Sequence, residues 1–382
     1  MYNVRSYGSM IADTVRMNAY AEALRKAVKP GDIVLDIGTG TGIFALLACQ
    51  YGAARVYAIE PNESIHLAKK LAKDNGFSDR IEFIQDISTK VNFIEKADVI
   101  ISDLRGLLPL FEKHIPALLD ARRRILRPGG VLIPKRDTLN VCVAEAPKLY
   151  KDYSDPWVAN PYNLNLSRAR ELSLNKWSHG RVNPEQMLTQ PHVWGVLDYH
   201  HLEIPDLRGN VTQRFVRNGL AHGLIVWFDA ELIDGIGFSN SPDCKEHTEV
   251  YGSAFFPFLH PVEVSENDEA RLELRAVLVN DEYTWCWNTH IISGENITKA
   301  NFQQSTFYGI IFSIEDLRKR QLGYIPKLNS SGLIEQFIQQ EMNGINSLET
   351  IAKKLLSRFP DQFSSLQEAI ERAGDSSQKY GS

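Results

Sequence analysis

The sequence predicts an α/β domain with a parallel, doubly wound sheet at residues 1–136, an antiparallel β domain at 137–310 and a small helical domain at 311–382. Up to about residue 136, apolar strands alternate with helices, which is the pattern of a parallel sheet with helices on its faces. Short alternating segments separated by Pro, Gly and Asn turns then dominate, as in antiparallel sheets. From about residue 327, apolar residues recur at helical spacing.

Length and composition fit this division and exclude several classes of protein. The chain has 382 residues, of which 43% are hydrophobic and 23% are charged, and its formal net charge is -5. Such a chain forms a globular core and is not disordered, fibrous or built on a disulfide framework. The mild acidity argues against nucleic acid as a partner.

Nothing in the sequence indicates a membrane or an extracellular location. The N-terminal residues lack the apolar stretch of a signal peptide, and no apolar run approaches the ~20 residues that span a bilayer. The four cysteines lie far apart, which excludes a CxxC metal or redox motif. We therefore expect a soluble, cytoplasmic protein with reduced thiols and no membrane partner.

The elements of the first domain follow from apolar spacing and from the residues that interrupt it. Val15, Ala19 and Leu24 share one face of a helix that Pro30-Gly31 ends. The apolar run after this break has the length of a buried strand. The same reasoning along the chain predicts helices over 12–28, 43–51, 63–75 and 113–126, strands over 33–36, 56–60, 81–84, 97–102 and 131–133, and a turn at 127–130.

The second domain is predicted from alternating apolar and polar residues, and the third from two helix-start signals. Residues 154–190, rich in Asn, Ser, Arg and Trp, form an arm-like insertion of weak periodicity. In the third domain, Asn346 with Glu349 and Ser365 with Glu368 have the spacing of a capping box. The strands predicted for the second domain are 138–144, 194–203, 221–233, 249–256, 269–279 and 283–292.

A glycine-rich turn follows the first predicted strand, in the run VLDIGTGTG from Val34 to Gly42. Glycines here let the backbone approach a ligand, and the next helix offers free N–H groups. The run is not a dinucleotide fingerprint GxGxxG, because Ile43 stands where the third glycine would be. Glu60 ends the next predicted strand, where a carboxylate can accept hydrogen bonds from a ribose diol. The alternative for the glycines is a tight turn without a ligand, and the alternative for Glu60 is a solvent-exposed strand end.

The run VLDIGTGTG resembles the first motif of class I S-adenosylmethionine (SAM) methyltransferases. Other segments narrow the resemblance to the protein arginine methyltransferase family. It covers residues 1 to about 280 and implies a Rossmann-like methyltransferase domain followed by an antiparallel β-barrel. The matching features are Met10, Asp13, Arg16 and Tyr20 of an M..D..R...Y helix, the strand ADVIISD at 97–103, Gly106 and Glu112 of a two-glutamate loop, LRPGGVLIP at 126–134 and GFSNSP at 237–242.

The resemblance also implies a cofactor site, with SAM as the cofactor, S-adenosylhomocysteine as the product and no metal. Arg16 would hold the SAM carboxylate, Glu60 the ribose, and Asp36 with the glycine turn the methionine part; a surface salt bridge is the alternative for Arg16. Asp86 and Ile87 would lie near adenine or be ordinary loop residues. The residues implied in cofactor binding are Met10, Arg16, Asp36, Gly38, Thr39, Gly40, Gly42, Glu60, Asp86 and Ile87.

The acceptor site departs from the family pattern. The family grips a target guanidinium between two glutamates, and here these positions hold Asp103, one methylene shorter, and Glu112. Arg105 stands between them where the family has an uncharged residue, so it either repels a substrate guanidinium or neutralises a carboxylate. The family's Thr-His-Trp loop becomes Thr248-Glu249-Val250, and Glu249 is either a third pocket carboxylate or an exposed charge. The catalytic residues we predict are Asp103, Glu112 and Glu249.

The third domain resembles a PqqD-like domain, a small winged-helix-like element that captures leader peptides in ribosomal natural-product pathways. The resemblance lies in YIPKLN at 324–329, the helix after it, Asn343-Gly344 and the helix IAKKLLSRF at 351–359. From Glu315 to Arg372 there are eight Lys or Arg and eight Asp or Glu, a balance that disfavours DNA as the ligand. Peptide capture would proceed by strand addition. A structural or dimerisation role is the alternative.

Together these features predict a SAM-dependent methyltransferase of a peptide or protein, with a ribosomal precursor peptide as partner and an arginine guanidino nitrogen as target. The alternatives are O- or carboxyl-methylation of another side chain, and a non-catalytic scaffold that binds peptide. The arm-like insertion lies where the family places a dimerisation arm, so a homodimer is a candidate assembly. The ten histidines lack metal-ligand spacing, and we interpret them as structural or surface residues, with His200 and His201 on a strand.

Overall fold

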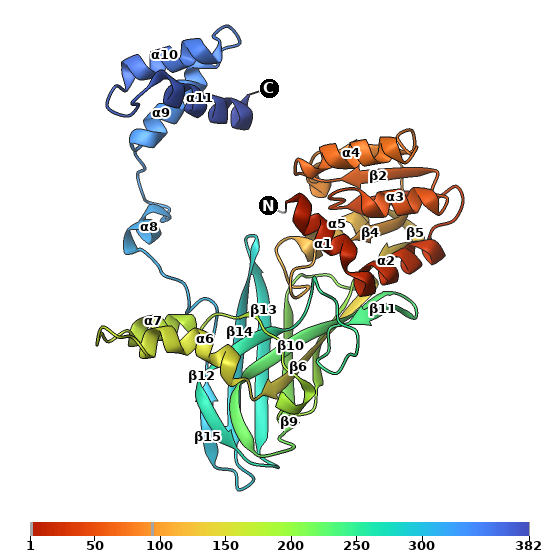
Figure 1. Ribbon diagram of the computed structural model, residues 1–382, viewed down its shortest axis with the longest axis vertical. Helices are drawn as coiled ribbons and strands as arrows, with labels where there is room; N and C mark the ends of the chain where they lie inside the picture. Colours follow the sequence, from red (N-terminus) through yellow and green to blue (C-terminus); the bar gives the residue numbers. More distant parts are fainter. Residues whose placement is uncertain (1–2, 93–94, 382) are drawn as a thin grey trace. The chain divides into compact units, whose positions relative to one another are not determined.

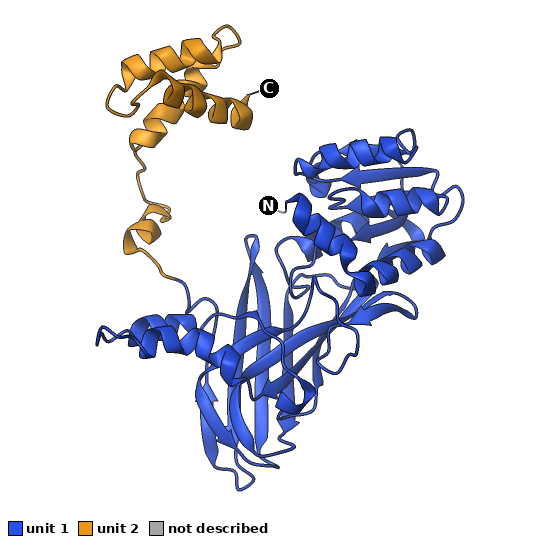
Figure 2. Cartoon of the chain, in the orientation of Figure 1, with its two compact units in different colours: residues 1–310 blue, residues 311–382 orange. Residues whose placement is uncertain are grey.

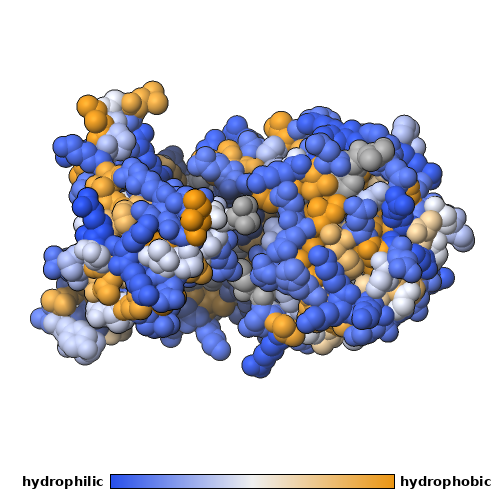
Figure 3. Space-filling model, turned by 90° about the horizontal axis from the view of Figure 1, so that it is seen from above, coloured by the Kyte–Doolittle hydropathy of each residue, from blue (hydrophilic) through white to orange (hydrophobic). Residues whose placement is uncertain are grey.

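The computed structural model describes residues 3–92 and 95–381, which form two compact units. The first unit spans residues 1–310 and the second 311–382 (Figure 2). Each has buried hydrophobic residues of its own, so each is described separately. One face of the molecule is mostly polar, with apolar residues in scattered patches (Figure 3). In the part of the chain that is described, no helix has the length and apolar character needed to cross a membrane.

The first half of unit 1 is a parallel five-stranded sheet with helical connections (Figure 1), as predicted. The strand order is β3-β2-β1-β4-β5, so the loops after β1 and β4 open side by side at the switch point where such sheets bind ligands. The strands are β1 (Ile33–Ile37), β2 (Arg55–Ile59), β3 (Ile81–Ile84), β4 (Ala97–Ser102) and β5 (Leu126–Ile133). The helices are α1 (Val4–Ala12), α2 (Thr14–Ala27), α3 (Ile43–Gln50), α4 (Ser64–Asp74), the short 3-10 helix η1 (Ser88–Lys90) and α5 (His114–Arg124).

Two local details of this half differ from the prediction. The helix predicted over 12–28 corresponds to α2, which starts at Thr14 because the Asp13 side chain accepts a hydrogen bond from the Arg16 N–H (3.1 Å), whereas α1 before it was not predicted. The turn predicted at 127–130 lies inside β5, where the ladder to β4 is irregular and Gly129 has a φ of 74°. Both differences arise from backbone and side-chain hydrogen bonding that apolar spacing does not reveal.

The second half of unit 1 consists of antiparallel strands, as predicted. One sheet has the order β7-β12-β10-β6-β8 with β11 paired to β10, and the other has the order β15-β14-β13-β9. The first contains β6 (Arg136–Ala144), β7 (Ser178–His179), β8 (His192–Asp198), β10 (Gly219–Ile233), β11 (Ile236–Ser239) and β12 (Ala254–Val264). The second contains β9 (Leu207–Arg214), β13 (Glu269–Val279), β14 (Glu282–Ile292) and β15 (Thr298–Phe302). The helices of this half are α6 (Pro147–Val158), α7 (Ser167–Ser173) and the short η2 (Pro184–Gln186).

The details of this half differ from the prediction. Among the described residues, the strand ladders form two sheets and not one closed barrel. Strands β7, β9, β11 and β15 were not predicted, and the strand expected from residue 249 begins at Ala254. The strand expected over 194–203 ends at Asp198, whose side chain accepts a hydrogen bond from the His200 N–H (3.1 Å). This hydrogen bond stabilises a turn after the strand, and His200 and His201 lie in that turn.

One hydrophobic core runs through both halves of unit 1. It includes Tyr20 of α2, Leu35 of β1, Phe228 of β10 and Trp287 of β14, which are all fully buried. Tyr20 stacks on Phe44 of α3, with ring centroids 4.7 Å apart. This shared core fixes the antiparallel sheets against the parallel one, so side chains from both halves can meet in one site.

Unit 2 is helical and has its own small core. Its helices are α8 (Ile314–Lys319), α9 (Ser330–Glu341), α10 (Leu348–Arg358) and α11 (Leu366–Tyr380). Ile338, Leu355 and Ala369, one from each of the last three helices, are fully buried there. The described residues of unit 2 contain no strand, and YIPKLN at 324–329 is not paired into a sheet. The sheet edge that strand addition would need is therefore missing from this part of the chain.

The helix starts of unit 2 agree with one predicted cap and correct the other. Ser365 caps α11 by accepting a hydrogen bond from the Glu368 N–H (3.2 Å), as its spacing predicts. Helix α10 is capped one residue later than predicted, because Ser347 and not Asn346 accepts a hydrogen bond from the Thr350 N–H (3.2 Å). Asn346 uses its amide on the end of α9 instead.

Candidate active site

A cavity of about 320 Å³ opens between the glycine turn after β1 and the loop after β4. Its wall includes residues 38–41 of the turn, Glu60 after β2 and residues 103–105 after β4. Side chains from α1 and α2, the start of α5 and the segment Val250-Tyr251 complete it. The volume lies within the range of small-molecule sites in proteins.

The glycine turn is shaped by positive φ angles and by Glu60. Gly38 and Gly40 have φ of 75° and 55°, which favours glycine. A Cβ on Gly38 would lie 2.3 Å from the Leu104 side chain, so the missing side chain lets the loop after β4 come close. Glu60 accepts hydrogen bonds from the Gly40 N–H (3.0 Å) and from the backbone and side chain of Asn62 (2.9 and 2.7 Å). A carboxylate can accept about four hydrogen bonds, so Glu60 retains capacity for a ligand hydroxyl.

Asp36, the acid before the turn, is fully buried. One of its oxygens accepts hydrogen bonds from the Thr39 hydroxyl (2.5 Å) and the Ala45 N–H (3.1 Å). The other oxygen has no partner among the described residues. Burial raises the pKa of Asp36 to about 7. Asp36 thus supports the turn from behind.

Asp103, directly after β4, is bound by cations and a hydroxyl. Two nitrogens of Arg16 lie 2.7 and 2.5 Å from one of its oxygens. The Tyr251 hydroxyl donates a hydrogen bond to the other oxygen. Burial by itself would raise the pKa of Asp103, but the charges of Arg16 and Arg105 hold it below its ordinary value. Asp103 is therefore ionised and largely committed to partners within the protein.

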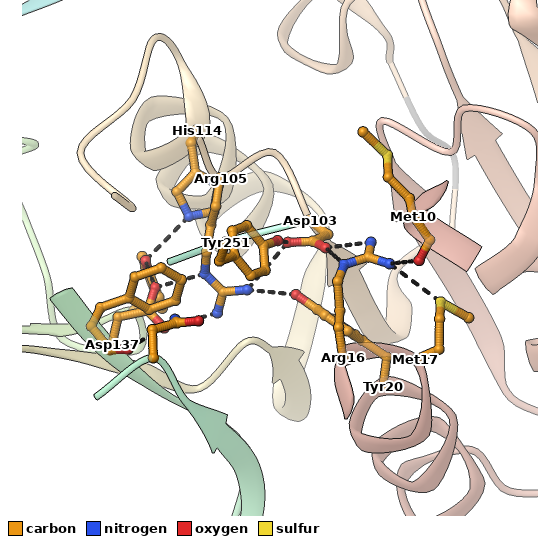
Figure 4. A network of polar contacts seen from close by, with 12 residues as sticks. Met10, Arg16, Met17, Tyr20, Asp103, Arg105, His114, Asp137 and Tyr251 are labelled. Atoms are coloured by element: carbon orange, nitrogen blue, oxygen red, sulfur yellow. Dashed lines mark hydrogen bonds and ion pairs between the residues drawn. The ribbon is translucent and has the colours of Figure 1, made fainter. Parts of the chain in front are cut away.

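Arg105 extends this arrangement into the antiparallel domain (Figure 4). Its Nε and one terminal nitrogen each lie 2.8 Å from an oxygen of Asp137 at the start of β6, a bidentate pair. Its other terminal nitrogen lies 3.2 Å from Asp103 and donates to the Tyr20 hydroxyl (2.5 Å). Arg16, Asp103, Arg105 and Asp137 thus form a buried row of alternating charges. The internal guanidinium neutralises carboxylates, which is one of the two roles that its position predicts.

The same network ends at His114, the first residue of α5. The Tyr199 hydroxyl donates to Asp137 (2.6 Å), and Nε2 of His114 lies 3.1 Å from the Tyr199 oxygen. His114 is 1% exposed and belongs to the cavity wall. Burial, assisted by the charge of Arg105, lowers the pKa of His114 to about 3, so its ring is neutral. Its Nδ1 has no partner among the described residues.

Asp13 joins the start of α2 to the loop before β12. One of its oxygens accepts the capping hydrogen bond of α2, from the Arg16 N–H. The other accepts hydrogen bonds from the backbone N–H groups of Glu249 (2.7 Å) and Val250 (3.0 Å). The side chain is buried, with the residue 2% exposed. This contact holds Val250 and Tyr251 at the cavity wall.

The predicted cofactor residues divide into three groups. Asp36 and Gly42 support the turn from behind, and Gly42, with φ of 85°, is the N-cap of α3. In the described part of the chain, the cavity wall does not include Asp86 or Ile87, and the Asp86 carboxylate accepts a hydrogen bond from the Ile87 N–H. The remaining predicted residues do line the cavity: Met10, Arg16, Gly38, Thr39, Gly40 and Glu60.

The predicted acceptor residues are also divided. Asp103 and Glu112 both line the cavity. Glu112 has a φ of 39°, uncommon outside glycine, and its exposed carboxylate has no hydrogen-bond or ion-pair partner among the described residues. The Glu249 side chain is exposed, and among described residues the wall contains its neighbour Val250 instead. The structure thus brings two of the three predicted acids together.

Sequence reasoning missed the buried groups around Asp103 and Arg105. Asp137, Tyr199 and Tyr251 were not considered, and His114 was grouped with structural histidines. The presence of Arg105 could have indicated a further acid, because a buried cation requires a counter-ion. Nothing local identifies Asp137, which lies 32 residues further along the chain.

Comparisons with known proteins place the chain first in a class and then in a family. A model described as "Methyltransferase domain" matches residues 34–130, which hold the glycine turn, Glu60 and the loop after β4. The site thus lies in a methyltransferase domain.

The chain is 32% identical over 244 residues to protein arginine N-methyltransferase 1 of Chlamydomonas reinhardtii, covering 62% of this chain and 70% of that protein. It is 33% identical over 240 residues to protein arginine N-methyltransferase 6 of Danio rerio, covering 59% and 68%. The chain belongs to the protein arginine methyltransferase family.

Similarity to solved structures supports the fold. Arabidopsis thaliana protein arginine methyltransferase 10 matches with a TM-score of 0.70 and 22% identity, covering 79% of this chain and 97% of that one. The Trypanosoma brucei PRMT1 enzyme–prozyme heterotetrameric complex with AdoHcy matches with a TM-score of 0.71 and 21% identity, covering 78% and 96%. Three plant relatives from Arabidopsis thaliana and Oryza sativa match over only 59–61% of their own length. The alignment with these plant proteins thus leaves a substantial part of each unmatched.

Replacing Asp137 with Ala should destabilise the protein strongly, since it removes the bidentate partner of a buried Arg105. Leaving a buried charge without its partner costs about 3–5 kcal/mol. Chemical denaturation at equilibrium measures this loss as a fall in the free energy of unfolding. The matched control is the Arg105→Met, Asp137→Ala double variant, which removes both charges and should lose clearly less. Equal stability of the single and double variants would contradict the ion-pair assignment.

Proposed function

We propose that this chain is a SAM-dependent methyltransferase that modifies a side chain of a peptide or protein. The observation that carries the proposal is one cavity that joins the glycine turn and Glu60 to the two acids Asp103 and Glu112. A cofactor site and an acceptor site that share a cavity are what direct group transfer requires. Membership of the arginine methyltransferase family supports the same reaction.

The residues of the turn suit SAM. Glu60 offers free acceptor capacity for ribose hydroxyls, and the glycine backbone leaves room for the methionine part. Arg16 reaches the cavity and would share its guanidinium between Asp103 and the cofactor carboxylate. Asp36 supports the glycine turn from behind, through its hydrogen bonds with Thr39 and Ala45. When bound, SAM supplies an activated methyl group on a sulfonium, and the protein has to orient the nucleophile and desolvate it.

The family names of the relatives favour an arginine guanidino nitrogen as the target. Glu112 supports this choice, because its carboxylate lines the cavity without an internal partner and can bind a guanidinium. Its exposure at the cavity mouth would also let an approaching side chain reach it. In this reading, Glu112 orients the acceptor and Asp103 organises Arg16 behind it.

Methylation of another side chain is the second candidate, and one observation favours it. Both oxygens of Asp103 already have partners in Arg16, Arg105 and Tyr251. Only one of the two carboxylates, that of Glu112, is then free to bind a guanidinium. A neutral nucleophile needs less negative charge around it. Assay of a degenerate peptide library by tandem mass spectrometry would distinguish the two targets by the residue that gains the methyl group.

We assign to unit 2 the recruitment of the substrate, a ribosomally made precursor peptide. The support is a compact unit with its own core and with apolar side chains on its surface, such as Ile345 (87% exposed) and Leu333 (46% exposed). Because the described residues of the unit contain no strand, recruitment would use a helical surface and not strand addition.

The proposal extends to assembly and location, which the arm-like insertion and the cysteines support. Tyr162 and Leu164 in the arm-like insertion are 76% and 59% exposed, which supports a homodimer formed through this arm. All four cysteines are free thiols, which supports the reducing cytoplasm as the location.

Replacing Glu60 with Ala should weaken binding of S-adenosylhomocysteine at least about tenfold, because charged hydrogen bonds contribute about 1.5–3 kcal/mol. Isothermal titration calorimetry measures the affinity directly. Glu63→Ala is the matched control, since Glu63 lies three residues later and outside the described cavity wall. Unchanged affinity in Glu60→Ala would remove the cofactor assignment.

Replacing Glu112 with Gln should lower methyl transfer at least about a hundredfold while S-adenosylhomocysteine still binds, since we assign this carboxylate to the acceptor and not to the cofactor. Asp103→Asn should also lower transfer, with a loss of stability because Arg16 and Arg105 lose their shared anion. Transfer from labelled SAM to the peptide library provides the rate. The exposed strand residue Glu82, replaced with Gln, serves as control. Normal turnover in both acid variants would refute the acidic acceptor site.

Removing residues 311–382 should raise the KM for a full-length precursor peptide about tenfold or more, because tethering supplies a high effective concentration of substrate. The kcat for a short core peptide should stay the same. The substrates to test are any small peptides encoded near this gene, each in full-length form and without its N-terminal segment. A truncated protein that binds S-adenosylhomocysteine and methylates both forms with normal KM would exclude recruitment by unit 2.

A further inference from the structure

We infer that His114 binds the methyl-acceptor group directly, with its Nδ1 accepting a hydrogen bond from an N–H or O–H of that group. The inference rests on the proposed function and adds to it the chemical class of the acceptor. It comes from three features of the described residues: a fixed tautomer, an unpartnered buried nitrogen and a neighbouring carboxylate in the same cavity.

The tautomer of His114 follows from proton counting along the network. Two nitrogens of Arg105 donate to Asp137, and the Tyr199 hydroxyl gives its single proton to the same carboxylate (2.6 Å). The Tyr199 oxygen can therefore only accept a hydrogen bond from Nε2 of His114, which lies 3.1 Å away. Nε2 must then carry the ring hydrogen. In a neutral imidazole the other nitrogen, Nδ1, then carries a lone pair.

This lone pair has no partner within the described part of the protein. His114 is 1% exposed, yet it belongs to the wall of the cavity. A buried acceptor without a hydrogen bond costs free energy, and a donor supplied by a ligand would recover it. Because α5 begins at this residue, the ring is held by a rigid element, which suits a group that has to orient a substrate.

The neighbours of His114 restrict what can bind there. Glu112 precedes it by two residues, lines the same cavity and has a free carboxylate. Asp103 is occupied by Arg16, Arg105 and Tyr251. The acceptor group therefore meets two hydrogen-bond acceptors, one charged and one neutral.

This pair of acceptors selects the class of substrate. A guanidinium, an amide or a hydroxyl can donate to them. An ionised carboxylate cannot, because it has no hydrogen to donate and would lie beside Glu112. Among the side chains considered for methylation, the inference therefore favours N–H and O–H groups and excludes carboxyl-methylation.

Two single substitutions separate this role from a structural one. An Asn side chain places its oxygen near the position of Nδ1 and loses the contact with Tyr199, whereas a Gln side chain reaches the position of Nε2 and loses the acceptor at Nδ1. We expect His114→Gln to lower kcat/KM at least about tenfold and His114→Asn to stay closer to the original protein. The reverse order would overturn the inference and assign His114 to the support of Tyr199.

The substrates for this comparison are the degenerate peptide library and two small probes, N-acetyl-arginine methylamide and N-acetyl-aspartate methylamide. Calorimetry with S-adenosylhomocysteine on both variants and on the original full-length chain provides the second readout. Equal cofactor affinity in all three, with the expected order of kcat/KM, supports the inference. Methylation of the aspartate probe would overturn it.

Nuclear magnetic resonance of the full chain labelled with ¹⁵N-histidine tests the tautomer without any turnover. The expected result is a neutral His114 with hydrogen on Nε2, and an Nδ1 resonance that shifts when the arginine probe is added to the protein loaded with S-adenosylhomocysteine. Hydrogen on Nδ1 in the free protein would overturn the inference. If S-adenosylhomocysteine fails to bind the original chain, the proposed function itself fails, which distinguishes the two results.

Discussion

The buried row Arg16–Asp103–Arg105–Asp137 is the interaction on which the arrangement of the site depends. Its members come from α2, the loop after β4 and the start of β6, so it connects the parallel sheet to the antiparallel domain. Buried charges are tolerated only when they are paired, and here two cations and two anions cancel. The pairing leaves the cavity wall close to neutral at this end. Glu112 then stands out as the carboxylate with unused capacity.

The two ends of the cavity are built by different means. At the cofactor end, glycines and backbone N–H groups shape a turn, and Glu60 holds it by accepting a hydrogen bond from Gly40. At the acceptor end, side chains hold one another, and the orientation of His114 depends on Tyr199. A backbone turn is specified locally, whereas a side-chain network requires the whole unit to be folded first. Under the proposed function, binding of the methyl acceptor would thus be more sensitive to distant substitutions than binding of the cofactor.

The same contrast explains what could be predicted from the sequence. The parallel sheet, the glycine turn and Glu60 are encoded in contiguous segments, so their spacing was enough. Asp137 and His114 were missed because their roles arise only when β6 and α5 pack beside Arg105. Helix α1 was not predicted, and the start of α2 depends on a single capping side chain, which periodicity does not detect. In unit 2, helices were predicted from apolar spacing, but the absence of a strand from its described residues required the structure.

The contact between Asp13 and the loop before β12 has a consequence for the variation of this loop among related sequences. Asp13 binds the backbone N–H groups of residues 249 and 250, which every amino acid except proline possesses. The junction is therefore indifferent to the side chains at these two positions. Mutations there can accumulate without detaching the loop from α2, so the side chains beside the cavity could change while the framework beneath them stays intact.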